Sequence, residues 1–391
     1  MKTVRLTALF LLTAILPLAQ AQTFSALHQF NSQGDGAFPE GSVVADSSGN
    51  IFGTTTNPST IFKIDSKGKE LVLFNINGGN VGDFPTGSLA RDAAGNLFGI
   101  AEGGSGGAGV VYKLSPQGQE TILFAFQGGL NTTTPKEPAG GVLLGKNGNI
   151  FGAAQFGNKR SCENGCGSIF RLDAAGTMHF LHAFTGGTDG ANPIGPLVQD
   201  AVGNLYGVAQ SGGDHSCPEF FEAAGAGCGV VFKIAKNGTF TVLHTFAGGA
   251  DGAVPQGGLL LDSAGNLFGT AVEGGIGENG TIYEIAKDGT YTVIHTFTQA
   301  EGQNPNGGLV LDTAGNLFGT AQLGGDLGLG TVFQLNPDGS VKVLHNFQGL
   351  DDGAVPLAGL FRDRTGRLLG TTVKNFLVQT IQGGNVFEVT P

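Results

Sequence analysis

Residues 242–285 have the sequence VLHTFAGGADGAVPQGGLLLDSAGNLFGTAVEGGIGENGTIYEI, which is one copy of a unit that recurs seven times along the chain. Each copy contains a tight turn, found at Gly49-Asn50, Gly95-Asn96, Gly148-Asn149, Gly203-Asn204, Gly265-Asn266 and Gly315-Asn316, with Gly366-Arg367 as a degenerate seventh. The spacing of these turns varies, while their chemistry stays constant. A unit of roughly fifty residues with loops of variable length is typical of a propeller or a solenoid.

Each copy contains four short β-rich segments, which we call A to D. In the copy quoted above they span residues 258–261, 266–270, 281–285 and 290–297. Aspartate and glycine in the A–B and C–D connections predict tight hairpins. Segments A to C are apolar at nearly every residue, which is typical of sheets covered on both faces. No segment has the sustained 3.6-residue period of a helix.

The two ends of the chain indicate a closed ring. The first segment after the N-terminal leader, residues 24–30, has the D pattern, whereas the last segment, residues 385–390, has the C pattern. The seventh copy therefore lacks its outer strand, and the N-terminal strand can supply it without leaving a free sheet edge. We predict an all-β, seven-bladed β-propeller with four-stranded antiparallel blades, closed by the N-terminal strand and forming one domain over residues 22–391.

Residues 1–21 have the features of a secretory signal peptide. Lys2 and Arg5 precede an apolar run from Leu6 to Leu18, and residues 19–21 form the small-x-small pattern of a cleavage site. We expect the mature chain to begin near residue 22 and to be exported to the periplasm, the cell surface or the medium. No later stretch reaches the ~18 apolar residues of a membrane span.

The charge of the chain narrows the choice of partners. The formal net charge is −11, and removal of Lys2 and Arg5 makes it −13. An acidic surface repels phosphate groups, so we expect neither nucleic acid nor an anionic membrane as a partner. The expected molecule is a monomer that binds a protein, a polymer or a small ligand.

The two faces of the predicted disc differ in their loops. The A–B and C–D turns lie together on one face and are short and uniform; we call this the short-turn face. The B–C and D–A loops lie on the opposite face and differ in length between copies; we call this the variable face. Binding residues concentrate on variable loops held by a rigid scaffold, so the variable face is the predicted ligand face.

Six acidic residues in the D–A loops are the candidate ligand-binding residues. They could surround the mouth of the central channel and hold a cation, with calcium as the candidate cofactor; they are Asp35, Asp83, Asp189, Asp251, Glu301 and Asp352. No loop has the dense D-x-D-x-D spacing of calcium ligands, so no residue is assigned as a metal ligand.

A second acidic series precedes the Gly-Asn turns and is predicted to cap them; it comprises Asp46, Asp92, Asp200, Asp262, Asp312 and Asp363. Five histidines recur at one position of segment D, where the other two copies have Phe74 and Phe124; they are His28, His182, His244, His295 and His345. Segment D is outermost in a blade, so these histidines lie apart around the rim. A packing position that accepts His or Phe explains them.

No residue is assigned a catalytic role. The stretch 103–107 matches G-x-S-x-G and 275–280 matches G-x-G-x-x-G, but both lie in B–C loops between strands. Those motifs need a strand-turn-helix context. No Ser/His/Asp set stands apart from the repeat.

The four cysteines all lie in the long B–C insertions of the third and fourth copies. Export and an even count favour the disulfides Cys162–Cys166 and Cys217–Cys228, although four cysteines allow three connectivities. The alternative is a zinc site formed by these cysteines and His215, whose spacings depart from C-x2-C.

The unit resembles the GloVer tandem repeat of bacterial exported proteins. The residues that carry the resemblance are 242–246, 251–255, 262–270 and 280–283, and it extends over essentially the whole mature chain. The resemblance implies a repeat protein without an established activity. The Asp-x-x-Gly-Asn-Leu-Phe turn is also similar to propellers of the virginiamycin B lyase and periplasmic sensor-kinase type, but no isolated His and Glu pair matches the lyase site.

These observations favour an exported, non-enzymatic binding scaffold that uses the B–C and D–A loops, because no group of residues suited to catalysis departs from the repeated pattern. The alternative function is an envelope lyase or hydrolase with its site at the mouth of the central channel.

Overall fold

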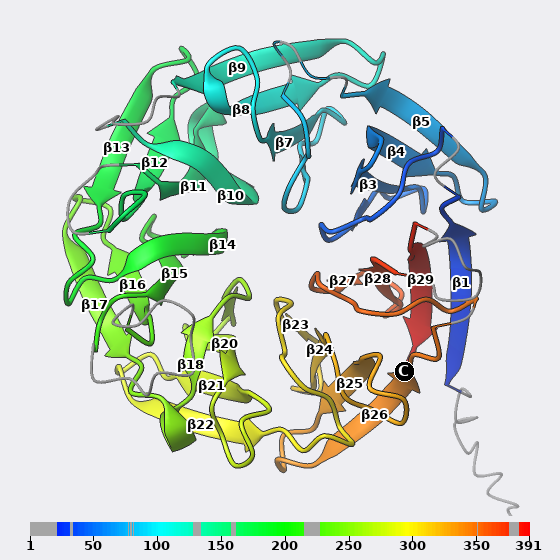
Figure 1. Ribbon diagram of the computed structural model, residues 1–391, viewed down its shortest axis with the longest axis vertical. Coiled ribbons are helices and arrows are strands. Elements are labelled where there is room, and N and C mark those ends of the chain that lie inside the picture. The colour runs from blue at the N-terminus through cyan, green and yellow to red at the C-terminus, as the bar shows by residue number, and fades with distance from the viewer. Residues whose placement is uncertain are drawn as a thin grey trace, which may run out of the picture.

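The computed structural model describes residues 22–31, 34–76, 78, 80, 82–127, 134–157, 162–214, 227–349, 351–374 and 383–391. These residues form seven antiparallel sheets that are arranged as blades around an open centre (Figure 1). The predicted seven-bladed β-propeller is confirmed. The predicted signal peptide lies outside the described residues. Within those residues, no helix has the length and apolar character needed to cross a membrane.

Each blade has its A strand nearest the axis and its D strand at the rim. Written from the axis outward, the first four blades are β2 (Val44–Ala45), β3 (Ile51–Thr56), β4 (Ser59–Ile64) and β5 (Glu70–Asn75); β6 (Ala90–Arg91), β7 (Leu97–Ala101), β8 (Gly107–Leu114) and β9 (Glu120–Gln127); β10 (Lys136–Leu144), β11 (Ile150–Phe156), β12 (Ser168–Leu172) and β13 (Met178–Ala183); β14 (Ala191–Gln199), β15 (Leu205–Ser211), β16 (Val230–Ile234) and β17 (Phe240–Thr245).

The fifth blade divides its innermost strand into β18 (Ala253–Pro255) and β19 (Leu260–Leu261), followed by β20 (Leu267–Glu273), β21 (Thr281–Ile285) and β22 (Tyr291–Thr296). The sixth comprises β23 (Val310–Leu311), β24 (Leu317–Ala321), β25 (Thr331–Leu335) and β26 (Val341–Asn346). The seventh comprises β27 (Phe361–Arg362), β28 (Leu368–Thr372), β29 (Asn385–Thr390) and β1 (Thr23–Gln29). Two 3₁₀ turns, residues 146–148 and 249–251, complete the described elements.

The ring closes through the N-terminal strand, as predicted. Strand β1 pairs antiparallel with β29, with Thr23 opposite Thr390 and Gln29 opposite Asn385. Near the axis, the Thr371 hydroxyl donates a 3.2 Å hydrogen bond to the Gly41 carbonyl and so joins the seventh blade to the first. The seam is therefore held at both its outer and its inner end.

Aromatic rings join neighbouring blades at six of the seven interfaces. A phenylalanine at the end of strand D or just after it packs edge-on against the aromatic residue of the next strand C, with centroids 5.4 Å apart for Phe184 and Phe232 and 4.9 Å apart for Phe297 and Phe333. The same contact recurs in the pairs Phe30–Phe62, Phe126–Phe170, Phe246–Tyr283 and Phe347–Phe387. Six of the seven blade interfaces thus share one core contact, which explains the recurring Val-Leu-His-x-Phe of segment D.

A glycine at the third position of strand B makes room for the strand-C aromatic ring in every blade. A Cβ at Gly319 would lie 2.6 Å from Cζ of Phe333, and one at Gly370 would lie 2.3 Å from Cζ of Phe387. Such a Cβ cannot be accommodated without moving a packed ring. The glycine is therefore required by packing rather than by its backbone torsion.

The aspartates before the Gly-Asn turns cap those turns, as predicted. Oδ1 of Asp312 accepts hydrogen bonds from the backbone N–H groups of Ala314 and Asn316, and Oδ2 accepts one from the Asn316 side chain. Burial of Asp312 would raise the pKa of its carboxyl, but these hydrogen bonds outweigh that effect and lower it. The use of an aspartate at this position in six of the seven copies is thus structural.

Two blades have tyrosine where the other five have phenylalanine in strand C. The side chains of Tyr112 and Tyr283 are fully buried, and neither hydroxyl has a hydrogen-bond partner. A buried hydroxyl without a partner costs about 1–3 kcal/mol. We expect Tyr283→Phe to raise the free energy of unfolding by about 1 kcal/mol, as measured by urea denaturation.

Tyr206→Phe is the matched control, because the Tyr206 hydroxyl donates a 3.1 Å hydrogen bond to Asp200. This change should lower the free energy of unfolding by about 0.5–1.5 kcal/mol. Destabilisation by both substitutions would contradict the conclusion that the buried Tyr283 hydroxyl has no hydrogen-bond partner.

The blades approach one another closely at the axis, where a segment of sequence Pro-x-Gly leads into strand A. A Cβ at Gly307 would lie 2.7 Å from both the Ala358 carbonyl oxygen and the Gly359 Cα of the next blade. The equivalent residues of the other blades are Gly41, Gly87, Gly140, Gly195, Gly257 and Ala358. Here backbone packs on backbone, so the position is almost restricted to glycine.

Gly307→Ala should therefore lower the free energy of unfolding by about 1–3 kcal/mol in urea denaturation, because the added methyl group meets backbone that cannot rotate away. Gly187→Ala is the control, because its Cβ would meet only the Thr185 hydroxyl at 3.4 Å. The control should change stability by less than about 0.5 kcal/mol. Equal effects of the two changes would disprove the steric argument.

Candidate functional site

The centre of the disc contains a pocket of about 470 Å³ that is lined mainly by the Pro-x-Gly segments leading into the A strands and by the residues next to them. Each blade presents its Pro-x-Gly segment to this space, so the position between proline and glycine is held at the same place in every blade. That position differs from blade to blade; it is occupied by Glu40, Thr86, Ala139, Ile194, Gln256, Asn306 and Leu357. A regular frame therefore presents an irregular set of side chains.

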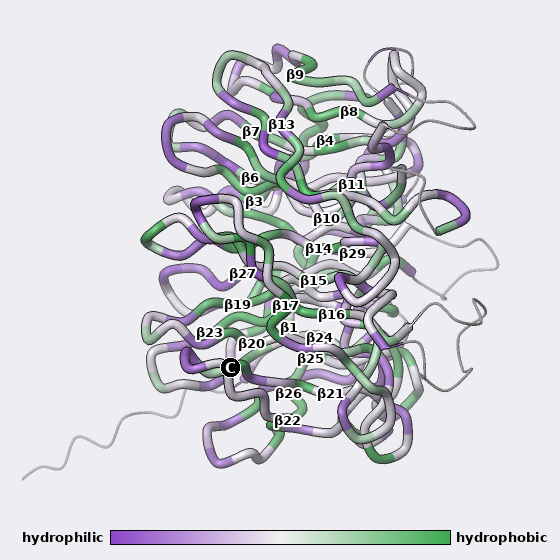
Figure 2. The backbone as a smooth tube through the Cα atoms, turned by 90° about the vertical axis from the view of Figure 1, so that its left-hand side faces the viewer, coloured by the Kyte–Doolittle hydropathy of each residue, from purple (hydrophilic) through white to green (hydrophobic). Residues whose placement is uncertain are grey.

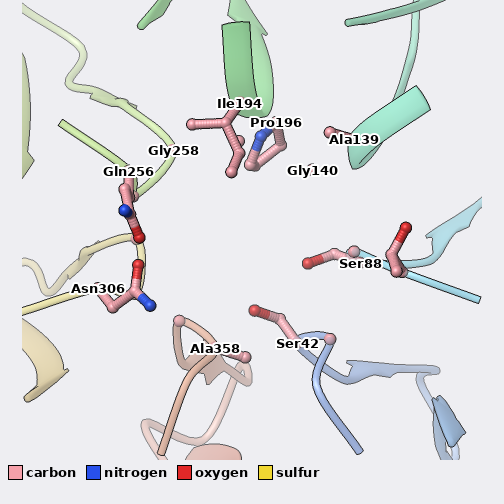
Figure 3. Close-up of a pocket in the computed structure, with 18 of the residues that line it drawn as sticks. Ser42, Ser88, Ala139, Gly140, Ile194, Pro196, Gln256, Gly258, Asn306 and Ala358 are labelled. Carbon is pink, nitrogen blue, oxygen red and sulfur yellow. The ribbon is translucent and has the colours of Figure 1, made fainter. Parts of the chain in front are cut away.

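Figure 3 shows how several of the lining side chains face the open centre. Gln256 and Asn306 lie next to each other on one side, and the hydroxyls of Ser42 and Ser88 point inward from the opposite side. Ile194 contributes an apolar surface between them. The pocket thus offers carboxamides and hydroxyls that can both donate and accept hydrogen bonds.

Three glutamates line the pocket on the first three blades, and two of them have raised pKa values. Burial raises the pKa of Glu40. Burial also raises the pKa of Glu102, and the charges of Glu137 and Glu40 raise it further. The lining contributed by the other four blades is uncharged. The pocket is therefore electrostatically one-sided.

The six acids predicted for the channel mouth are not among the residues that line this pocket. Five of them lie instead beside the rim histidines, and each follows its histidine by six or seven residues. The pairs are His28–Asp35 at 3.4 Å, His182–Asp189 at 3.0 Å, His244–Asp251 at 3.0 Å, His295–Glu301 at 3.4 Å and His345–Asp352 at 2.9 Å. The sequence correctly indicated their loops, but each D–A loop folds back onto its own D strand. Their role in ligand binding stays a prediction.

Asp83, the sixth acid, follows a blade with Phe74 in place of histidine. Its backbone forms an isolated antiparallel bridge with Glu102, so it lies beside the pocket lining rather than in it.

The histidines occupy a packing position, as predicted. His182 stacks on Phe240, His244 stacks on Tyr291 and His345 stacks on Phe24, with centroids 3.5–3.8 Å apart. Each stacking partner belongs to the D strand of the next blade. The histidine–acid pairing is a second role that the sequence analysis missed, although histidine and acid recur six or seven residues apart in all five copies.

Burial of His295 lowers its pKa below the ordinary value of 6.5, and the nearby Glu301 only partly opposes this effect. The unfolded state therefore takes up a proton more readily than the folded state. Above about pH 6.5 His295 is neutral in both states and does not oppose folding, whereas below that value its protonation favours the unfolded state and lowers the free energy of unfolding. We expect the free energy of unfolding to decrease between about pH 7.5 and about pH 5.5, and His295→Phe to reduce that decrease.

Urea denaturation at both pH values would measure this change. His179→Phe is a suitable control, because His179 lies outside the recurring position and its side chain is 40% exposed. An unchanged pH dependence in His295→Phe would show that other groups are responsible.

The predicted disulfide Cys162–Cys166 is confirmed, with Cα atoms 5.2 Å apart. Cys228 is also disulfide-bonded, whereas Cys217 and His215 lie outside the described residues, so the pairing Cys217–Cys228 stays a prediction. The Cys166 carbonyl accepts a hydrogen bond from the Asn192 N–H of the next blade. This insertion is thereby tied to the neighbouring blade. Across the part of the chain that the structure describes, no group of three His, Cys, Asp or Glu residues could hold a metal ion.

The two faces also differ in charge. Figure 2 shows the disc edge-on, with the short turns after β6, β19, β23 and β27 on one side. The half of the disc nearer these turns carries fourteen described lysines and arginines, namely Lys63, Lys67, Lys69, Arg91, Lys113, Lys146, Arg171, Lys233, Lys236, Lys287, Lys342, Arg362, Arg364 and Arg367. It carries an equal number of carboxylates, namely Asp46, Asp65, Glu70, Asp92, Glu120, Asp173, Asp200, Asp262, Glu284, Asp288, Asp312, Asp338, Asp363 and Glu388.

The variable half carries only two described cations, Lys136 and Lys374. Its described carboxylates number fifteen; they are Asp35, Glu40, Asp83, Glu102, Glu137, Glu163, Asp189, Asp214, Asp251, Glu273, Glu278, Glu301, Asp326, Asp351 and Asp352. The formal charges of the short-turn half cancel. The whole net negative charge of the described residues therefore lies on the variable face.

The model of the Gloeobacter/Verrucomicrobia repeat family matches residues 13–160, 102–226 and 219–391. The chain belongs to this repeat family. The match extends over all seven blades and confirms the resemblance that the Gly-Asn turns and their flanking strands indicated. Among curated proteins, no match to this member of the family was found.

Solved structures similar to this family member are propellers. A streptogramin B lyase superposes with a TM-score of 0.64 at 14% identity, covering 94% of this chain and 97% of the lyase. Catalytically inactive virginiamycin B lyase from Staphylococcus aureus with quinupristin gives 0.62 at 15% identity, covering 95% and 100%. The extracellular domain of a putative hybrid two-component system from B. thetaiotaomicron gives 0.60 at 10% identity, covering 94% and 40%. At these identities the likeness shows the fold alone.

Proposed function

We propose that this protein is an exported, non-enzymatic scaffold that binds its ligand at the channel mouth and on the surrounding loops of the variable face. The observation that carries the proposal is the residue between proline and glycine at the start of strand A. Seven-fold geometry holds this residue at the channel, yet its chemistry differs from blade to blade. A rigid frame with varied side chains is the usual construction of a binding site.

The lining indicates the chemistry of the ligand. Gln256 and Asn306 can hydrogen-bond to hydroxyl, amine or carbonyl groups, and Ser42 and Ser88 can do so from the opposite side. Ile194 offers an apolar contact. A volume of about 470 Å³ is within the range of small-molecule sites. A small polyhydroxylated or amino-substituted molecule, free or at the end of a polymer, fits these features.

The test is a thermal-shift screen of residues 22–391, which contain all seven blades, against neutral oligosaccharides, amino sugars and small lactones. We expect at least one compound to raise the melting temperature. The double variant Gln256→Ala/Asn306→Ala should bind that compound about tenfold more weakly in calorimetry, because two hydrogen-bonding groups are lost.

Gln119→Ala is the matched control, because it removes an exposed carboxamide from a C–D turn on the short-turn face. It should bind the compound like the unmodified protein. Full binding by the double variant would remove the channel mouth from the proposal.

A lyase or hydrolase at the channel mouth is the second candidate function, and Glu102 is the observation that favours it. Burial and two neighbouring carboxylates raise the pKa of Glu102, which is the direction of shift that a general acid requires. Two of the similar propellers are described as a streptogramin B lyase and a virginiamycin B lyase. Incubation with streptogramins and lactones, with and without divalent cations, should give no turnover. Turnover that is abolished by Glu102→Gln would replace the scaffold proposal with this one.

A further inference from the structure

We infer that the variable face docks a basic protein partner, one that presents lysine or arginine side chains together with apolar side chains. This inference rests on the proposed function, because it assigns a class of partner to the same face. The charge distribution is its first basis: fifteen described carboxylates and only two described cations lie on this face, whereas the opposite face is formally neutral. A field of one sign on one face speeds association with a partner of opposite charge and orients it.

Repulsion among the carboxylates of this face supports the inference. The charges of Glu137 and Glu40 raise the pKa of Glu102, after the larger effect of burial, and Glu278 does the same to Glu273. Lys136–Glu137, at 3.8 Å, is the single ion pair between a described Lys or Arg and a carboxylate on this face. Cations brought by a partner would relieve this repulsion.

Exposed apolar side chains on the same loops are the second, independent basis. Ile276 is 84% exposed and Leu327 is 62% exposed; both lie in B–C loops, on the fifth and sixth blades. Phe84, in the D–A loop before the second blade, is 51% exposed. Apolar anchors within a charged surface are typical of protein interfaces. A small cation such as a polyamine could neutralise the carboxylates but could not bury these side chains.

The probe is a fluorescent peptide of alternating lysine and leucine clusters, tested by anisotropy with residues 22–391. A peptide with glutamate in place of lysine and a peptide with serine in place of leucine are the two comparisons. We expect only the lysine–leucine peptide to bind tightly. Its affinity should fall at least about tenfold between low and physiological salt, because surface charges are screened. Equal binding of spermine and the peptide would overturn the inference in favour of a small cation.

Two pairs of variants locate the binding surface. Glu163→Gln/Glu273→Gln/Asp326→Asn removes three charges from the variable face, and Glu70→Gln/Glu120→Gln/Glu284→Gln removes three from the short-turn face. Both triple variants have the same net charge, yet only the first should weaken peptide binding, by about tenfold. Equal weakening by both would show that net charge alone attracts the peptide and would overturn the inference.

Ile276→Ser/Leu327→Ser removes two exposed apolar side chains from the variable face. Its control is Leu71→Ser/Val202→Ser, because these residues are 55% and 65% exposed on the D strand of the first blade and on an A–B turn. Only the first pair should weaken binding. Thermal melting establishes that all four variants are folded. A neutral ligand that binds the channel mouth while no basic peptide binds would disprove this inference and leave the proposed function intact; failure of both classes would disprove both.

Discussion

The close approach of neighbouring blades at the axis is the constraint on which the rest of the structure depends. At Gly307 and its equivalents the backbone of one blade touches the backbone of the next, so a side chain larger than hydrogen is excluded at six of the seven positions and only Ala358 departs from this rule. Blades this close bring each D-strand phenylalanine within reach of the aromatic ring in the next strand C. That ring in turn needs the strand-B glycine beneath it. The glycine of Pro-x-Gly, the D-strand phenylalanine and the strand-B glycine thus all follow from the short distance between neighbouring blades.

The same constraint strains the chain at one point in every blade. The residue before the proline has positive φ in all seven copies, although none is glycine; the residues are Phe38, Phe84, Glu137, Asn192, Val254, Asn304 and Val355. In several blades its N–H donates to a carbonyl of the preceding B–C loop, as Asn192 does to Cys166 and Val254 does to Cys228. These hydrogen bonds between blades hold a torsion that such residues rarely adopt alone. The backbone conformation just before strand A is therefore fixed by hydrogen bonds to the neighbouring blade rather than by the intrinsic conformational preference of the residue.

These contacts explain why the fold could be predicted from the sequence. Turn capping by Asp312, the strand-B glycine and the D-strand phenylalanine recur in almost every copy, so their spacing alone indicates the blade and the ring. The closure was also readable, because a D-type strand at one end completes a C-type strand at the other. Long-range geometry was not readable. Asp251 folds back onto His244 rather than toward the axis, and nothing in a single D–A loop specifies that direction.

The repeat that made the fold predictable also concealed the candidate site. Residues such as Glu40 and Gln256 lie inside the constant Pro-x-Gly frame, and their variation within that frame was the available signal. It was obscured because a position next to a glycine that recurs in six of the seven copies is easily taken as part of the turn. The structure shows that the glycine faces the next blade while its neighbour lines the pocket. Two adjacent residues are thus under different constraints: the glycine allows neighbouring blades to pack, and the residue before it faces the ligand pocket. Only the residue before the glycine is free to vary without disturbing the ring, and such variation is what allows a rigid scaffold to bind a particular ligand.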